Sequence, residues 1–280
     1  MPEESRKLWS WFRPPPIARR LWIALVVSTA YAALVLVIQP SIFPGRPPWA
    51  TELAIVNTAI IGLLVSFRTK VAYDRWWEGR MLWGQLVNTS RNLCLKVREL
   101  VHPNPEEQRQ LAILVSAFPL ALMRHLRGSV RLSELAGFEK ESATPAHVPA
   151  DIAGRLISTI AEWRAAGRID GHMHQILDTH TSAFMDVCGA CERVRNTPLP
   201  SSYLSLMRHG LVFGFLITPW TIVYTFGWWT LLVQATVVYF LFGIELTAEA
   251  VEQPFGFDGD DLPLELYCET VRLSAEDILK

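Results

Sequence analysis

The chain has 280 residues, half of them hydrophobic, and its 26 Lys and Arg residues nearly balance its 27 Asp and Glu residues. The counts of 16 Gly, 18 Pro and four Cys exclude collagen-like, disordered and disulfide-scaffold classes. The lack of a basic excess argues against nucleic-acid binding. Four stretches contain no Asp, Glu, Lys or Arg: 21–40, 53–67, 211–227 and 228–244. Since the other residues are charged to the extent of an ordinary soluble domain, the composition predicts a membrane protein with a water-facing part.

The first two predicted membrane helices lie within residues 21–67. Residues 21–40 match the ~20 apolar residues that a spanning helix needs and exceed the ~7–15 of a signal-peptide core. Residues 53–67 are shorter than a clean span. We therefore expect this second helix to continue into the following residues or to be shielded from lipid by its neighbours.

Residues 209–244 form the third apolar region, with 36 residues and no formal charge. This length suits two short membrane helices joined by a tight turn. The turn is predicted at Gly227, because glycine permits the reversal and the following Trp228 and Trp229 suit a membrane interface. Pro219 is expected to kink the first arm of this hairpin.

The distribution of Lys and Arg predicts the orientation of the chain. Residues 1–20 hold five of them, Arg6, Lys7, Arg13, Arg19 and Arg20, whereas residues 41–52 hold only Arg46. By the positive-inside rule the N-terminal segment 1–20 is cytoplasmic. With four crossings, residues 68–208 and 245–280 are cytoplasmic as well, and Gly227 lies outside.

The predicted cytoplasmic domain, residues 68–208, carries 18 Lys and Arg against 14 Asp and Glu and has helical periodicity. Its helices are expected in five stretches, up to about Val101 and over 108–126, 133–141, 150–165 and 172–196. The tail 245–280 holds ten acidic residues against Arg272 and Lys280 and is expected to be largely exposed. The predicted fold class is all-α, with four transmembrane helices continuous with a helical cytoplasmic domain.

Two strings carry a resemblance to a known family, SFRTKVAYDRWWEGRMLWGQLVN at 66–88 and PFGFDGDDLPLE at 254–265. With the order of the predicted helices, they make residues 21–270 resemble the bestrophin family of ion channels, including its bacterial members. The resemblance implies a homopentamer in a bacterial inner membrane, with the second membrane helix lining a central pore. It implies passage of monovalent ions, either chloride and other anions, as in most of the family, or Na⁺ and K⁺, as in some bacterial members. The implied partners are other copies of the chain, the permeating ions and the lipid bilayer.

The second membrane helix presents two stripes of side chains. Ala59, Leu63 and Phe67 recur every four residues and form one stripe. The resemblance assigns them to a hydrophobic pore neck, where an apolar ring can gate by dewetting. Ala59 departs from the bulkier residue usual at its position. The neighbouring stripe is small and would let adjacent helices approach closely; it consists of Thr58, Gly62 and Ser66.

A signature of four residues, Asp74, Arg75, Trp76 and Trp77, follows the membrane part of this helix. The Trp pair is expected to anchor the helix at the interface. Asp74 and Arg75 are expected to act as a structural ion pair and not as a conduction element.

The resemblance also implies a second, cytoplasmic constriction on the helix that begins near residue 171. The alignment slips by one residue there, so either His172 or Met173 is the candidate. If His172 lines the pore, its titration between about pH 5 and 8 would make conduction pH-sensitive.

The acidic cluster near residue 260 supplies oxygen ligands of the kind that Ca²⁺ prefers. The resemblance places Asp258 and Asp261 at the carboxylate positions of a calcium clasp, with Gln253 near a backbone ligand. Phe257 and Gly259 replace acidic neighbours, which lowers the charge of the candidate site. No cofactor is expected to be required, and Ca²⁺ is the one candidate ion.

Two alternatives from other classes remain open, a membrane-anchored metal-dependent enzyme and a membrane scaffold. The enzyme would use a cluster composed of His172, His174, Asp178 and His180, although helical spacing makes only His174 and Asp178 clear neighbours. Cys188 and Cys191 form a lone CxxC that is expected to be two buried, reduced thiols. The sequence shows no set of residues typical of a catalytic site, so it favours an ion channel over an enzyme.

Overall fold

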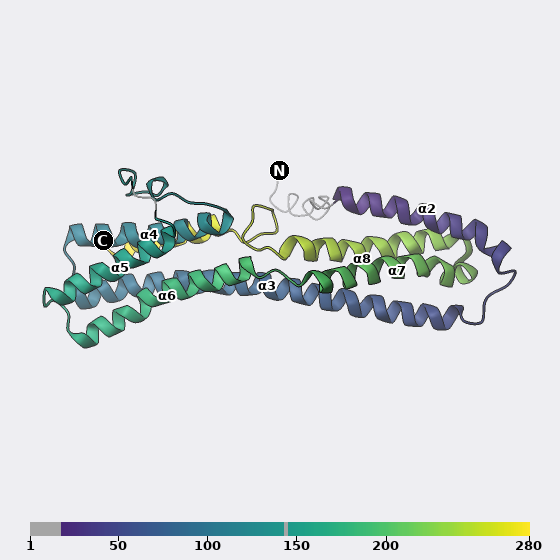
Figure 1. The fold of residues 1–280 in the computed structure, drawn as a ribbon, viewed down its shortest axis with the longest axis horizontal. Coiled ribbons are helices and arrows are strands. Elements are labelled where there is room, and N and C mark those ends of the chain that lie inside the picture. Colours follow the sequence, from purple (N-terminus) through teal and green to yellow (C-terminus); the bar gives the residue numbers. More distant parts are fainter. Residues whose placement is uncertain (1–17, 143–144) are drawn as a thin grey trace, which may run out of the picture. The chain divides into compact units, whose positions relative to one another are not determined.

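The computed structural model describes residues 18–142 and 145–280, and every regular element within these ranges is helical (Figure 1). The basic residues Arg6, Lys7 and Arg13, on which part of the predicted orientation depends, lie outside the described residues. The α-helices are α2 (Ala18–Ile42), α3 (Ala50–Val101), α4 (Pro105–Arg127), α5 (Val148–Ala165), α6 (Gly171–Asn196), α7 (Ser201–Phe226), α8 (Thr230–Val251) and α9 (Leu264–Ile278). The described ranges also contain two 3₁₀ turns, η1 (Leu132–Glu134) and η2 (Gly227–Trp229). The predicted all-α class is therefore confirmed.

Three helical stretches in the described ranges are long and apolar enough to cross a membrane: Ala18–Ile42, Ala50–Val101 and Ser201–Val251. The last stretch consists of α7 and α8, which reverse direction at η2 and lie side by side (Figure 1). Gly227 has the left-handed φ of +51° that glycine tolerates, and Trp228 and Trp229 are exposed beside it. The turn predicted at Gly227 is confirmed. The second helix also continues as expected, because α3 runs on without a break from its apolar start to Val101.

The chain divides into two compact units, each built from two segments of sequence. The first unit contains the described residues up to Asp74 together with Leu199–Glu252. It therefore holds α2, the start of α3, α7 and α8. The second unit contains Arg75–Pro198 and Gln253–Lys280, and thus the rest of α3 with α4, α5, α6 and α9.

Side-chain hydrogen bonds join the helices of the first unit. Gln39 of α2 donates to the carbonyl of Trp220 on α7 at 3.1 Å, and the Trp220 indole donates to Tyr31 at 2.8 Å. The Tyr31 hydroxyl in turn donates to the carbonyl of Leu216 at 3.1 Å. Hydrogen bonds of this kind hold helices together where apolar burial alone cannot, because lipid tails are as apolar as the side chains.

Pro219 lies in the middle of α7, which continues through it as one helix. Proline has no N–H to donate to the carbonyl four residues earlier, which is that of Phe215. Gln234 of α8 supplies the missing donor, because its Nε2 lies 3.2 Å from the Phe215 carbonyl and 2.7 Å from Ser28 Oγ of α2. This buried amide therefore links α2, α7 and α8 at one point.

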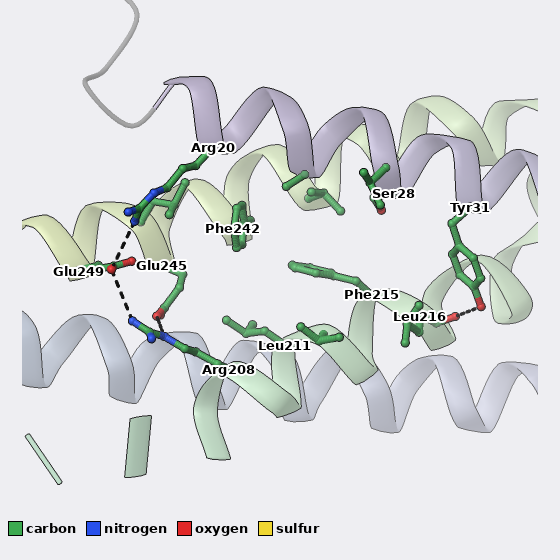
Figure 2. A pocket seen from close by; sticks show the side chains of 15 residues that line it. Arg20, Ser28, Tyr31, Arg208, Leu211, Phe215, Leu216, Phe242, Glu245 and Glu249 are labelled. Atoms are coloured by element: carbon green, nitrogen blue, oxygen red, sulfur yellow. Dashed lines mark hydrogen bonds and ion pairs between the residues drawn. The ribbon is translucent and has the colours of Figure 1, made fainter. Parts of the chain in front are cut away.

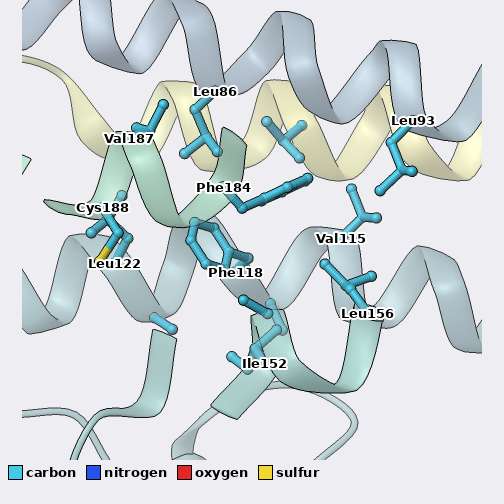
Figure 3. Packing of buried hydrophobic residues seen from close by; sticks show 14 of the residues in the cluster. Leu86, Leu93, Val115, Phe118, Leu122, Ile152, Leu156, Phe184, Val187 and Cys188 are labelled. Atoms are coloured by element: carbon cyan, nitrogen blue, oxygen red, sulfur yellow. The ribbon is translucent and has the colours of Figure 1, made fainter. Parts of the chain in front are cut away.

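The second unit has a continuous apolar core (Figure 3). At its centre the rings of Phe118 on α4 and Phe184 on α6 meet edge to face, with centroids 4.9 Å apart. Figure 3 also shows Leu86 and Leu93 of α3 and Leu156 of α5 pointing into this core. The predicted helical periodicity was a reliable guide here, because each of the helices around this core turns one apolar face inward.

The helix boundaries in this unit follow the predicted breakers. Helix α3 ends at Val101, and α4 begins with a capping box in which Asn104 accepts from the Glu107 amide and Glu107 accepts from the Asn104 amide. The predicted helices at 108–126, 150–165 and 172–196 are observed as α4, α5 and α6. Only the stretch 133–141 differs, because it reduces to the 3₁₀ turn η1.

The acidic tail 245–280 corrects the expectation of a largely exposed segment. Glu245 and Glu252 are buried in the first unit, where α8 extends to Val251. After residue 263 the tail forms the amphipathic helix α9, whose apolar face is buried in the core of the second unit and consists of Leu264, Cys268, Val271 and Ala275. Counting charges missed this face, because its apolar residues recur at helical spacing among the acidic ones.

Candidate functional site

Helix α3 presents opposite faces in the first unit. The buried face consists of Asn57, Ile61, Val65 and Arg68. On the other face the predicted neck residues Ala59, Leu63 and Phe67 are all exposed, with 56% exposure for Leu63 and 51% for Phe67. Their apolar side chains are thus not used by the packing of the described residues. They are available to a pore or to another copy of the chain.

Side chains of α3 pack against two glycines of α7. A Cβ at Gly214 would lie 2.5 Å from Ile61 Cδ1, and one at Gly210 would clash with Leu64. Gly210 and Gly214 form a GxxxG motif, which allows membrane helices to approach closely. Asn57 Nδ2 adds a hydrogen bond to the Gly214 carbonyl at 3.1 Å. This motif is a signal that the sequence analysis missed.

The second predicted stripe, Thr58, Gly62 and Ser66, is exposed like the neck residues. A Cβ at Gly62 would meet nothing within 4 Å inside this chain. The stripe therefore plays no part in the packing of the described residues and leaves a surface on which another helix would fit closely.

Arg68 follows directly after Phe67 and is 1% exposed. Its Nη2 lies 2.8 Å from Glu252 Oε2, and its Nε lies 3.2 Å from Glu245 Oε2. Arg208 reaches Glu245 at 3.6 Å from the surface side. A buried guanidinium between two carboxylates fixes the rotation of α3 about its own axis, and with it the direction in which Phe67 points. Arg68 was not among the residues predicted from the sequence, although a charge at the end of an apolar stretch marks such a role.

The signature residues Asp74 and Arg75 have structural partners. Asp74 accepts from Lys70, one helical turn earlier, at 2.9 Å. Arg75 donates to the carbonyls of Val194 at 2.5 Å and Thr197 at 2.7 Å. It thereby satisfies carbonyl groups at the C-terminal end of α6, where cations are favoured.

The two signature tryptophans also have defined surroundings. The Trp76 indole donates to the carbonyl of Asp260 at 3.1 Å, and its ring packs against the core of the second unit. The Trp77 ring lies 5.1 Å from the Arg80 guanidinium and is 44% exposed. Trp76 thus tethers the acidic loop around Asp260 to α3.

The two candidates for the cytoplasmic constriction differ in their surroundings. Met173 is partly buried and packs against the core of the second unit. His172 is exposed in the first turn of α6, which Asp170 caps by accepting from the Met173 amide at 2.7 Å. Of the two side chains, only that of His172 is directed to solvent.

The acidic loop is closed by its own hydrogen bonds. The Asp261 carboxylate accepts from the Asp258 amide at 2.6 Å, and the Asp258 carbonyl accepts from the Asp261 amide at 3.1 Å. Burial raises the pKa of Asp261, and the neighbouring carboxylates add to the rise. Gln253 is exposed. Within the described ranges, these carboxylates do not gather into a group of three ligands around one point.

The predicted His cluster on α6 does not assemble in the described structure. His180 instead faces Lys96 of α3, with 2.6 Å between Nε2 and Nζ. Burial, followed by the charge of Lys96, lowers the pKa of His180 below its ordinary 6.5. The four cysteines are buried and free, as expected of reduced thiols, and burial raises the pKa of Cys94 and of Cys188 to about 12.

A different trio of ligand types converges among the described residues, His125, His147 and Glu192. Glu192 Oε1 lies 2.7 Å from His125 Nε2 and 2.8 Å from His147 Nε2. His147 also caps α5, since its Nδ1 accepts from the Ala150 amide at 3.1 Å. A neutral His147 that accepts at Nδ1 carries its proton on Nε2 and donates it to Glu192. The trio is thus a hydrogen-bonded junction of α4, α5 and α6, and metal binding at this Nε2 would disrupt it.

Comparison with protein families gives one match that covers nearly the whole chain. The family described as "Bacterial/Fungal Bestrophin protein" matches residues 6–277. Among similar proteins, the voltage-dependent anion channel-forming protein of Nostoc sp. is 32% identical over 234 residues, which cover 80% of this chain and 76% of the relative. The protein of the same name in Escherichia coli K12 is 30% identical over 240 residues, covering 81% and 78%.

Solved structures agree in fold. The crystal structure of a bacterial bestrophin homologue from Klebsiella pneumoniae matches with a TM-score of 0.82 over 92% of this chain and 97% of that chain, at 22% identity. A point variant of that homologue gives a TM-score of 0.84 over 93% and 99%, at 21% identity. The helical arrangement is therefore the same in both proteins.

Proposed function

Because the chain belongs to the bacterial and fungal bestrophin family, we propose that it forms a homopentameric anion channel in a bacterial inner membrane. The relatives are named for anion channel formation and not for an enzymatic activity, which supports a channel over the enzyme and scaffold alternatives. The observation that carries the proposal is the exposed apolar stripe of α3, opposite a fully packed face of the same helix.

Ala59, Leu63 and Phe67 form the hydrophobic neck in this proposal, with one ring from each of three helical turns. A ring of apolar side chains opposes a continuous water column when it is narrow and admits one when it widens. In this proposal the rings act as the gate. Because they carry no charge, the sign of the permeating ion is decided elsewhere along the pathway.

The proposed topology places the N-terminal segment, the second unit and the tail in the cytoplasm. The excess of Lys and Arg in residues 1–20 over residues 41–52 supports it. In this topology Trp228 and Trp229 lie at the outer interface, where exposed tryptophans are favoured. His172 is then the better candidate for the cytoplasmic constriction, because Met173 is engaged with the core of its own unit.

A Ca²⁺ site at Gln253, Asp258 and Asp261 stays a prediction. The internal hydrogen bonds of the loop and the exposure of Gln253 support a structural turn more than they support a Ca²⁺ site. If Ca²⁺ binds there, millimolar Ca²⁺ will raise the unfolding temperature of the protein but not that of a D258N/D261N variant. Equal shifts of the unfolding temperature in both proteins would show that Ca²⁺ does not bind at these residues.

The channel proposal is tested by the reversal potential of purified protein in planar bilayers under a KCl gradient, repeated with NaCl. A reversal near the chloride equilibrium potential is expected. A reversal near the cation equilibrium potential would show that the same pore selects cations and not anions. No current from protein shown to be folded and pentameric would contradict the channel itself.

The neck is tested by Leu63→Ala. Removing three carbons from each side chain of the ring lowers the dewetting barrier, and we expect a several-fold rise in single-channel open time. Leu34→Ala is the matched control, since Leu34 lies on α2 with 54% exposure against 56% for Leu63. A similar effect of both substitutions would show that Leu63 acts through general destabilisation and not in a neck.

A further inference from the structure

A cavity of about 530 Å³ lies between α2, α7 and α8 in the first unit (Figure 2). Its wall is almost wholly apolar along most of its length, where Figure 2 shows Leu211, Phe215 and Phe242 around the space. Tyr31 lies at one end, with its hydroxyl bonded to the Leu216 carbonyl. The volume falls in the ~300–1,000 Å³ range of sites for small ligands.

The opposite end of the cavity carries both positively and negatively charged side chains (Figure 2). Arg20 lies 3.4 Å and Arg208 3.7 Å from Glu249, and Arg208 lies 3.6 Å from Glu245. These distances exceed the 2.8 Å between Arg68 and Glu252, so the pairs at the mouth are looser than the buried one. The side chains of Arg20, Arg208 and Glu249 are 69%, 50% and 41% exposed. Hydrogen-bonding positions on the positive and on the negative groups are therefore open to a ligand.

We propose that this cavity binds one acyl chain of an aminophospholipid, with the phosphate against Arg20 and Arg208 and the ammonium group against Glu249. Arg20 and Tyr31 are eleven positions apart in the sequence, which corresponds to ~16 Å along the helix and to about half of the ~30 Å hydrocarbon thickness of a bilayer. The cavity therefore matches a chain from one leaflet.

The charge pattern selects the headgroup. Guanidinium groups suit phosphate, because their planar donors match its oxygens. A primary ammonium offers three N–H donors to Glu249, whereas a choline headgroup has none and a glycerol headgroup has no positive charge. Ethanolamine headgroups are therefore expected to bind in preference to choline and glycerol headgroups.

The chain offers a matched pair of substitutions to test the cavity. Ala24 lines it, whereas Ala30 is an exposed residue of the same helix that does not. The purified oligomer is incubated with an equimolar mixture of phosphatidylethanolamine, phosphatidylcholine and phosphatidylglycerol, and lipids retained per protomer are counted by native mass spectrometry. Ala24→Trp should reduce retained lipid at least tenfold and Ala30→Trp should leave it unchanged. Equal retention in the two variants would overturn the proposal.

The headgroup assignment is tested on the unmodified protein and therefore does not depend on whether a variant folds. Retention mainly of phosphatidylethanolamine supports the assignment, and equal retention of the three lipids or a preference for phosphatidylglycerol overturns it. Glu249→Gln should abolish the preference for ethanolamine over glycerol headgroups, and an unchanged preference would also overturn it. Lipid counting needs no ion flux, so the result is independent of whether the protein conducts.

Discussion

The side-chain amide of Gln234 satisfies a carbonyl that Pro219 leaves without its helical donor. Gln234→Leu should therefore leave the Phe215 carbonyl without this donor and cost about 1–3 kcal/mol of stability. Pro219→Ala restores an N–H at that position, so the same Gln234 substitution should cost distinctly less in a Pro219→Ala background. Thermal unfolding of the four proteins in one detergent gives the coupling between the two positions. Additive effects would show that the hydrogen bond contributes nothing to stability.

Arg68 offers a second prediction at the same scale. Arg68→Met removes the cation between Glu245 and Glu252 and should destabilise the protein by about 3–5 kcal/mol, because two buried carboxylates lose the guanidinium that lies between them. Lys70→Gln breaks an exposed pair with Asp74 and should cost at most about 1 kcal/mol. Combining Arg68→Met with Gln at both glutamates should recover much of the loss. If the triple variant unfolds as early as Arg68→Met, the loss is due to packing and not to unpaired charge.

At the scale of elements, α6 predicts a dependence of stability on pH. The pKa of His180 is lowered in the folded state by burial and by Lys96, so protons bind the unfolded state more readily. The contribution of His180 to the free energy of unfolding is complete at pH values above the unfolded pKa near 6.5. It is lost as the pH falls toward the lower pKa of the folded state. The drop in unfolding temperature from pH 7.5 to pH 5.5 should be smaller in His180→Gln than in the unmodified protein. An equal drop in the two proteins would show that His180 does not contribute to the pH dependence.

The elements themselves were largely predictable from the sequence. Stretches without charge and breakers such as the one after Val101 located the helices, because membrane helices and amphipathic helices leave strong periodic signals. The polar contacts between helices were not predictable, since Gln234 and Arg68 find their partners 19 and 177 residues away in the chain. The trio of His125, His147 and Glu192 was missed for the same reason: three helices bring together residues that have no spacing relation.

At the scale of the whole molecule, the exposed surface of α3 predicts association of copies. The small stripe containing Gly62 is open in the single chain, and a close helix–helix contact there would not tolerate a large side chain. Gly62→Leu should therefore reduce the pentamer population seen by native mass spectrometry, although leucine favours the helix itself. Gly243→Leu, at an equally open glycine of α8, is the control and should leave the pentamer intact. Pentamers of unchanged abundance in Gly62→Leu would place the contact between copies elsewhere.

The burial of α9 in the core of the second unit has a consequence for biosynthesis. The face of α4 that α9 covers stays uncovered on the ribosome until residues 264–278 have been translated, which happens only after the α7–α8 hairpin. The second unit therefore waits, incomplete and with apolar surface exposed, while the hairpin is delivered to the insertion machinery. Such a waiting intermediate is a natural substrate for chaperones. Ribosomes stalled before residue 264 should carry nascent chains that are cleaved by protease within α4, and those stalled well beyond residue 280 on an extended linker should not.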